Sequence, residues 1–285
     1  MNHPKLPASH SVRVNLSDTV YRALQKRASE TGDSINHLIQ RALVDEFDIE
    51  HHTLYQVSTS TALVQGVYQG CVTVGQIKQH GNFGLGTYDA LDGEGLMLDG
   101  RVWHAMSNGQ VVEAPDGETA PFWVCTEFEA DQEATLATVS SWDDLTTQLD
   151  KLHSSQNLFV AYRVDGEFDE INYRVACKSE PGTNLVAATS HQAEFTFQKC
   201  TGTLMGFWTP TYARTFNIPG YHLHFLSEDH QHGGHVLNVK AQNLKVQVMT
   251  VQNVTMALPE SPQFLAADLS GDPSAALSKA EGARD

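Results

Sequence analysis

The sequence predicts a mainly β protein of the α+β class, with mixed or antiparallel sheets in a barrel-like or two-sheet core and few helices. Three observations support this prediction. From residue 62 onward, short apolar stretches that alternate with polar residues recur between glycine turns. One stretch in that part has helical spacing. The first fifty residues follow another pattern, so we predict a β-α-α segment over 1–50, a linker over 51–61 and a β domain over 62–285.

The composition narrows the class of protein. The 285 residues carry a formal net charge of -16, which argues against a binder of polyphosphates. No apolar run is long enough to span a bilayer, and the start of the chain lacks a secretory h-region. The four cysteines are scattered along the chain: Cys71, Cys125, Cys177 and Cys200. They fit thiols in a reducing compartment, so we expect a cytoplasmic protein without a membrane partner.

The N-terminal segment reads as one strand followed by two helices. Residues 11–16 alternate between polar and apolar, as in a strand. Ser17 is a suitable N-cap for a first helix, Gly32 a suitable end, and Ser34 a suitable N-cap for a second, amphipathic helix. This order over about residues 11–47 resembles the ribbon-helix-helix family.

That resemblance implies a pairing of two chains and contact with DNA. In the family, two chains pair their strands, and the outward side chains enter the major groove; here these are Ser11, Arg13 and Asn15. Up to Val44 the segment has six lysines and arginines against three acids. The acidity of the rest of the chain argues against tight DNA binding, so a dimerising arm is the alternative.

The linker prediction rests on the polar stretch 51–61, where we expect His51 and His52 to be solvated rather than metal ligands. The β domain follows it and contains about 200 residues. Its helical stretch is "SWDDLTTQLDKLH", in which Ser141 can act as the N-cap and four apolar residues have helical spacing: Trp142, Leu145, Leu149 and Leu152.

Residues 222–236, "HLHFLSEDHQHGGHV", contain five histidines. On a strand, His222 and His224 project from one face, and a hairpin returns His235 beside them. Three neutral imidazoles with one open position are typical of a catalytic zinc site. His230 and His232 lie in the turn and are expected to be exposed. A histidine-rich surface hairpin without a metal is the competing interpretation.

Two motifs around this hairpin resemble the acetolactate decarboxylase family. One is "GTLMGFWTPTYARTFNIPGYHLHFLSEDHQHGGHVLNV", residues 202–239, and the other is "GNFGLGTYDALDGEGLMLDGRVW", residues 81–103. Both occur in the family's order, and the resemblance extends from about residue 63 to the C-terminus. Gly95 and Leu96 depart from it, since a bulkier pair is expected after the motif glutamate.

The resemblance implies a reaction and a set of residues. The family converts 2-acetolactate to acetoin and CO2 at one Zn²⁺, which stabilises an enediolate before stereospecific protonation. Its zinc ligands correspond to His222, His224 and His235. Its other site residues correspond to Glu94, to Arg174 (alternative Arg163) and to Glu281 (alternative Glu260), while Thr87 and Thr203 are candidates for the pocket wall.

Two other functions remain open from the sequence alone. One is a ligand-sensing DNA-binding regulator built from the N-terminal segment and a decarboxylase-like domain. The other is a β protein with a structural metal site, which would lack an open coordination position. For the enzyme, we expect 2-acetolactate as the small-molecule substrate and a homodimer as the assembly.

Overall fold

The computed structural model describes residues 12–32, 34–46, 52–153, 155–180 and 182–281. The chain divides into two compact units, Met1–His51 and His52–Asp285. The second unit therefore begins about ten residues before the predicted β domain. Each unit is described by itself below.

The first unit contains the two predicted helices, α1 (Asp18–Thr31) and α2 (Ile35–Glu46). Ser17 caps α1, because its Oγ accepts a hydrogen bond from the Val20 backbone N–H at 3.4 Å. Gly32 ends α1 with φ +81°, and its N–H donates to the Ala28 carbonyl oxygen at 2.9 Å. The local signals for both ends of this helix are confirmed.

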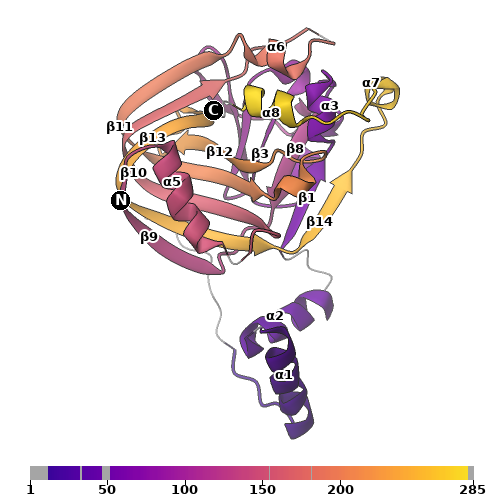
Figure 1. Cartoon of the computed structure of the whole chain (residues 1–285), viewed down its shortest axis with the longest axis vertical. Helices are drawn as coiled ribbons and strands as arrows, with labels where there is room; N and C mark the ends of the chain where they lie inside the picture. Colours follow the sequence, from indigo (N-terminus) through magenta and orange to yellow (C-terminus); the bar gives the residue numbers. More distant parts are fainter. Residues whose placement is uncertain (1–11, 33, 47–51, 154, 181, 282–285) are drawn as a thin grey trace. The chain divides into compact units, whose positions relative to one another are not determined.

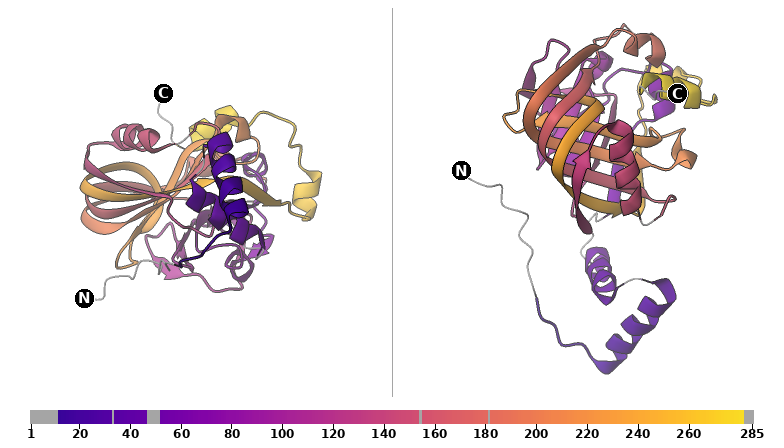
Figure 2. Two further views of the ribbon diagram at one scale, coloured as in Figure 1. Left: turned by 90° about the horizontal axis from the view of Figure 1, so that it is seen from below. Right: turned by 60° about the vertical axis from the view of Figure 1, so that its left-hand side comes forward.

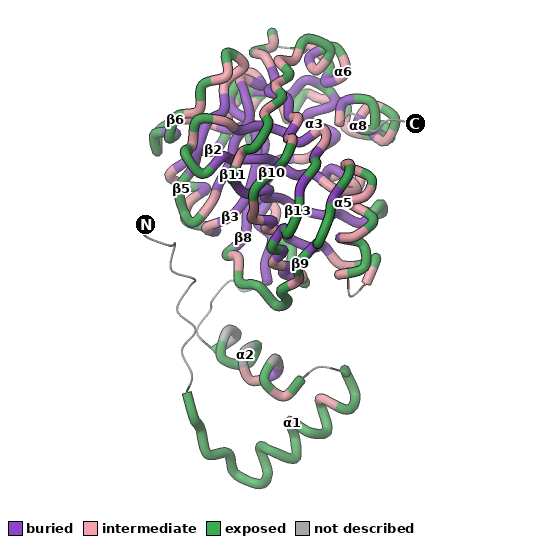
Figure 3. Tube along the Cα trace, turned by 90° about the vertical axis from the view of Figure 1, so that its left-hand side faces the viewer, coloured by how far each residue is buried: buried purple, intermediate pink, exposed green. Residues whose placement is uncertain are grey.

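The strand predicted for residues 11–16 is wrong for its described part, since residues 12–16 form no strand. A β-strand needs a neighbour to pair its backbone groups, and a single copy of this segment supplies none among its described residues. The apolar residues of the segment are correspondingly exposed, with Val12 at 79 %, Val14 at 67 % and Val20 at 46 %. Figure 3 shows α1 exposed along nearly its whole length.

The second unit is built on a mixed seven-stranded sheet (Figure 1). Its first and last strands in sequence, β1 and β14, pair in parallel, and its other pairs are antiparallel. The strands in spatial order are β14 (Asn253–Ala257), β1 (Thr53–Val57), β8 (Phe122–Thr126), β3 (Phe83–Thr87), β4 (Glu94–Leu98), β5 (Arg101–Ala105) and β6 (Val111–Glu113).

A second, antiparallel sheet consists of long strands that curve side by side (Figure 2). In spatial order they are β10 (Phe159–Val175), β11 (Ala193–Thr209), β12 (Gly220–Ser227), β13 (Gly233–Val251) and β9 (Gln132–Val139), and β10 also pairs with β13. A small ladder joins β2 (Val72–Thr73) to β7 (Thr119–Ala120). The predicted mainly β fold with mixed and antiparallel sheets is confirmed.

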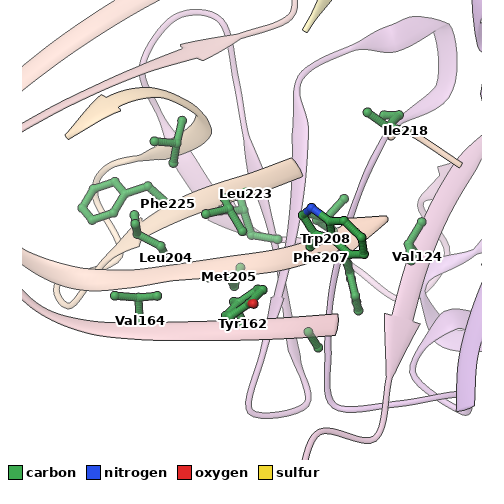
Figure 4. Packing of buried hydrophobic residues seen from close by; sticks show 14 of the residues in the cluster. Val124, Tyr162, Val164, Leu204, Met205, Phe207, Trp208, Ile218, Leu223 and Phe225 are labelled. Carbon is green, nitrogen blue, oxygen red and sulfur yellow. The ribbon is translucent and has the colours of Figure 1, made fainter. Parts of the chain in front are cut away.

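Apolar side chains from both sheets form one core. Leu85 and Leu96 of the seven-stranded sheet belong to the same buried cluster as Val164 and Phe225 of the other sheet. Figure 4 shows members of this cluster from β8, β10, β11 and β12. A second cluster, which contains Trp123, includes other residues of the seven-stranded sheet. Both faces of that sheet are therefore apolar, as expected for a buried layer.

The helices of this unit are short. The predicted helix is present as α5 (Trp142–Leu149), with Ser141 accepting a hydrogen bond from the Asp144 N–H at 3.2 Å. Figure 1 shows α8 beside α3, and both contact α6. The other elements are α3 (Ser60–Val64), α4 (Val74–Ile77), α6 (Leu185–Thr189), α7 (Pro262–Ala266), α8 (Ser274–Ala280) and the 3₁₀ turns η1 (Asp89–Leu91), η2 (Asp150–Leu152) and η3 (Thr211–Ala213).

The predicted linker, residues 51–61, is wrong, because it contains β1 and the start of α3. Every residue of β1 is buried. Its polar side chains misled the prediction because polar groups can be buried where they find hydrogen-bond partners: the Gln56 Nε2 donates to the Ser58 and Phe216 carbonyl oxygens. His52, expected to be solvated, is 6 % exposed and bonds the Thr250 carbonyl oxygen through Nδ1; His51 lies outside the described residues.

Two predictions from composition can be compared with the structure. All four cysteines lie in the described part of the chain and are thiols rather than disulfides. None of the described helices combines the length and apolar character needed to cross a membrane.

Candidate metal centre

The predicted hairpin places three histidines together at the start of β13. His222 and His224 point to one face of β12, and the register pairs His224 with His235 across the hairpin. One ring nitrogen of each lies within 4.8 Å of the others, and all three residues are buried. Within the described residues this is the group that could hold a metal ion; we call it the histidine triad.

The protonation of the triad suits a metal. The Nδ1 of His224 lies 2.9 Å from the Gly95 carbonyl oxygen, which can only accept, so Nδ1 carries the hydrogen and Nε2 keeps its lone pair. That Nε2 is 3.2 Å from Nε2 of His222. Burial, with a smaller contribution from the positive Arg174, lowers the pKa of His222 to about 3. Burial likewise lowers the pKa of His224 and His235, so the three rings are neutral donors.

The two turn histidines are not fully exposed, which corrects the prediction. His230 stacks on Trp103 with ring centroids 4.2 Å apart, and His232 lies 3.7 Å from the ring of Phe197. Both are half-buried because an aromatic neighbour covers one face of each imidazole. Neither belongs to the triad, as predicted.

Glu94 is the first residue of β4 and is buried next to the triad. Its Oε1 accepts a hydrogen bond from the Ala176 N–H at 3.0 Å, and its Oε2 lies 3.6 Å from Nε2 of His224. Burial raises the pKa of Glu94 to about 7, although the nearby Arg174 acts in the opposite direction. The site therefore contains a carboxyl group able to hold a proton near neutral pH.

Arg174 and Glu281 complete the polar side of the site. Arg174 lies near the end of β10 and pairs with His235 in the β10–β13 register. Its Nη2 is 3.4 Å from Glu281 Oε2, and the same oxygen is 3.5 Å from His235 Nε2. Glu281 follows α8, which is anchored by the buried Leu277, so this C-terminal glutamate reaches the triad.

The alternative residues lie elsewhere. Arg163 is bound to Asp99 and Asp165 near the opposite end of β10. Thr203 donates a hydrogen bond to Asp165 at 2.6 Å and so lies with Arg163 rather than with the triad. Glu260 is exposed.

One cavity joins the predicted residues and adds an apolar wall. Thr87 lines it together with the three charged residues and with His222 and His235 of the triad, whereas His224 is not among the lining residues. The wall residues carry no local signal in the sequence, because they come from strands, helices and loops that are far apart in the chain. The lining residues are Leu63, Gly86, Thr87, Leu91, Glu94, Phe122, Arg174, Ala176, Leu185, Thr189, Ile218, His222, His235 and Glu281.

The small residue after Glu94 has a packing explanation. Gly95 pairs with Gly86 across β3 and β4, and the indole of Trp123 lies over both. A Cβ at Gly95 would come within 2.2 Å of that indole, and one at Gly86 within 2.3 Å. Gly95 therefore compensates for a large neighbour, and its carbonyl oxygen still faces His224.

Comparison with known proteins identifies the family of the chain. A family model described as alpha-acetolactate decarboxylase matches residues 54–271. The chain belongs to the alpha-acetolactate decarboxylase family. The match begins in β1, which supports the correction of the predicted linker.

Individual relatives of the decarboxylase family cover most of the chain. An alpha-acetolactate decarboxylase of Methanosarcina mazei is 38 % identical over 250 residues, which are 87 % of this chain and 85 % of that protein. One of Methylococcus capsulatus is 38 % identical over 233 residues, which are 81 % of this chain and 90 % of that protein. The crystal structure of the Bacillus subtilis strain 168 decarboxylase is 33 % identical, with a TM-score of 0.78 over 81 % of this chain and 99 % of that one.

Proposed function

We propose that this protein is a zinc-dependent decarboxylase that converts 2-acetolactate to acetoin and CO2. Membership of the decarboxylase family supports the reaction. The observation that carries the proposal is the histidine triad beside Glu94, Arg174 and Glu281 in one cavity. Three neutral imidazoles on rigid strands suit Zn²⁺ and leave a coordination position open for substrate.

Decarboxylation of 2-acetolactate needs an acceptor for the electron pair of the broken bond and a donor for the proton that the product carbon receives. When the bond to the carboxylate carbon breaks, its electron pair moves into the neighbouring ketone, and a proton must then be added to one carbon. A zinc ion on the triad would supply Lewis-acid stabilisation of the negative charge that develops on the substrate oxygens.

The remaining steps fall to the chain's own side chains. The guanidinium of Arg174 has an Nε with no hydrogen-bond partner among the described residues, and it is suited to hold the substrate carboxylate. Glu94 Oε2 faces the triad and is placed to deliver the proton, while Glu281 orients Arg174. The apolar wall would exclude water from the reacting carbon.

The test is acetoin formation from racemic 2-acetolactate by the zinc-loaded chain and by Glu94→Gln. We expect the variant to retain zinc and to lose turnover by about a hundredfold or more, since general acid catalysis contributes on that order. Glu260→Gln is the matched control, because Glu260 is exposed, and it should keep full activity. Full activity in Glu94→Gln would contradict the role of Glu94.

We further propose that the enzyme is a homodimer in which the N-terminal unit contributes to pairing. The exposed Val12, Val14 and Leu16 precede an amphipathic pair of helices and have no cover in the described part of one chain. Val14→Glu should shift the chain toward monomer in sedimentation. An unchanged mass would show that this segment does not pair. A gel shift that is lost in Arg13→Ala would instead favour the DNA-binding alternative.

A further inference from the structure

The turn before Glu94 has an unusual backbone. Ala90, Leu91 and Gly93 have φ values of +59°, +57° and +88°, in the left-handed region that residues with a side chain rarely adopt. Such a backbone persists only where its surroundings fix it. Because Glu94 is the next residue, the position of its carboxyl group depends on what holds this turn.

His104 of β5 contacts the turn directly. It lies opposite Gly95 in the β4–β5 pair and is 6 % exposed. Its Nε2 is 2.5 Å from the Asp92 carbonyl oxygen. A carbonyl oxygen only accepts, so Nε2 carries the hydrogen and donates it to the peptide group between Asp92 and Gly93. Asp92 is two positions before Glu94 in the chain, so the bond holds the backbone just before this glutamate.

The orientation of His104 is fixed by partners that do not line the cavity. Its Nδ1 lies 2.8 Å from Oε1 of Glu118, and because a carboxylate oxygen also only accepts, the ring donates from both nitrogens when it makes both bonds. The ring of Tyr88 stacks on the imidazole, with centroids 3.9 Å apart, and the Tyr88 hydroxyl donates to the Trp103 carbonyl oxygen at 3.0 Å. The histidine is thus held on two sides and is buried, as a rigid support requires.

The absence of a side chain at Gly93 allows the turn and His104 to lie this close together. A Cβ on Gly93 would lie 2.7 Å from Nε2 of His104 and 2.3 Å from the Ala105 carbonyl oxygen. The turn therefore fits closely against β5, and on its other side the Gly93 carbonyl oxygen accepts a hydrogen bond from Thr87 Oγ1 at 2.8 Å. Thr87 lines the cavity, whereas His104 is not among its lining residues.

We infer that His104 is a positioning residue for decarboxylation: by binding the Asp92 carbonyl oxygen it holds the turn that aims Glu94 at the histidine triad. This inference rests on the proposed function of Glu94. His104 does not contact the cavity and acts through the backbone. A histidine that only stabilises the fold is the alternative, and it predicts a loss of stability without a specific loss of turnover.

Two substitutions with side chains of similar size distinguish a positioning role of His104 from a purely structural one. In His104→Gln the side-chain amide nitrogen reaches the position of Nε2 and can still donate to Asp92. In His104→Asn the side-chain amide nitrogen reaches the position of Nδ1. This variant therefore keeps the contact with Glu118 and loses the bond to Asp92. We expect His104→Asn to lower kcat about tenfold, with KM and zinc content unchanged, because small displacements of a catalytic group have effects of this order or larger. His104→Gln should stay within about twofold of the unaltered protein in kcat, because its bond to the turn is retained.

Hydrogen exchange gives a readout that does not depend on the reaction. The Asp92 and Gly93 amides donate within the turn, to Asp89 and Leu91. His104→Asn should speed exchange of these two amides, and His104→Gln should not. If the unaltered protein forms no acetoin, the proposed function fails, while this exchange comparison still decides whether His104 holds the turn.

The matched control is His52→Gln, in which the side-chain amide reaches the position of Nε2, so that the bond from Nδ1 to the Thr250 carbonyl oxygen is lost. His52 is also 6 % exposed, with one ring nitrogen against a backbone carbonyl oxygen and the other 3.4 Å from the Asp131 carboxylate, but it does not line the cavity. It should lose stability and keep its kcat per folded molecule. The inference is overturned if His104→Asn keeps full kcat and slow exchange, if His104→Gln loses as much kcat as His104→Asn, or if His52→Gln loses as much kcat as His104→Asn.

Discussion

Each end of strand β10 carries an arginine that pairs with a carboxylate, yet the surroundings of the two arginines differ. Arg163 donates from Nε to Asp165 at 2.9 Å and from Nη1 to Asp99 at 2.7 Å, so two acids balance its charge. Arg174 has one acid, Glu281, at 3.4 Å, and its other acceptors among the described residues include the neutral Gln192 side chain and the Ala280 carbonyl oxygen.

The difference indicates how an arginine that binds substrate, the role proposed for Arg174, can be distinguished from a structural one. A carboxylate partner is common to both ends, but the Arg163 side chain is 18 % exposed and that of Arg174 only 7 %. At the Arg174 end, the Nε is buried without a hydrogen-bond partner in the described part of the chain, and Arg174 is one of the residues that line the cavity. An unsatisfied buried donor is unfavourable, so an anionic ligand would remove the deficit.

The largest expected effect is at the metal ligands beside Arg174. His224→Ala should reduce bound zinc to near zero and acetoin formation by more than about a hundredfold, because removing a ligand has at least the effect of removing its supporting partner. His232→Ala, in the same hairpin but outside the triad, is the control and should retain zinc. Equal zinc content in the two variants, measured by atomic absorption, would contradict the assignment of the triad.

The next effect separates the two arginines. Arg174→Ala should lower kcat/KM by about a hundredfold, since a lost charge-assisted contact to a buried anion costs about 3 kcal/mol. Arg163→Ala should keep kcat/KM and instead lower the free energy of unfolding by about 2 kcal/mol, because it leaves Asp165 without its partner. Paired kinetics and urea unfolding measure both quantities. Equal kinetic losses in the two variants would remove the distinction between the ends of β10.

The smallest effect concerns the two threonines. Thr87→Val should lower kcat severalfold, because the Thr87 hydroxyl holds the Gly93 carbonyl oxygen beside Glu94. Thr203→Val loses a hydrogen bond to Asp165 and should lower stability by about 1 kcal/mol without a kinetic change. A kinetic loss confined to Thr203→Val would reverse this prediction.

The sequence predicted the triad because alternation along a strand and one short turn are local rules. His222, His224 and His235 needed only the period of two and a hairpin to be brought together. The helix at Trp142–Leu149 was predicted for the same reason, since its cap and apolar spacing lie within one stretch.

The errors arose where long-range contacts decide. Gln56 in β1 looked like a linker residue, because its hydrogen-bond partner Phe216 is 160 positions away in the chain. The strand at residues 12–16 was predicted from an alternation that one copy of the chain cannot satisfy by itself. Ile218 and Leu185 of the cavity wall carry no local signal, because ordinary apolar residues become a wall only through the fold.

The most direct test of the account is a zinc titration of the metal-stripped full-length chain, with acetoin formation from racemic 2-acetolactate measured at each step. We predict that the rate rises in proportion to bound zinc and stops rising at one zinc per chain. A chain that binds zinc at the triad and forms no acetoin, or one that forms acetoin equally well after the metal is removed, would contradict it.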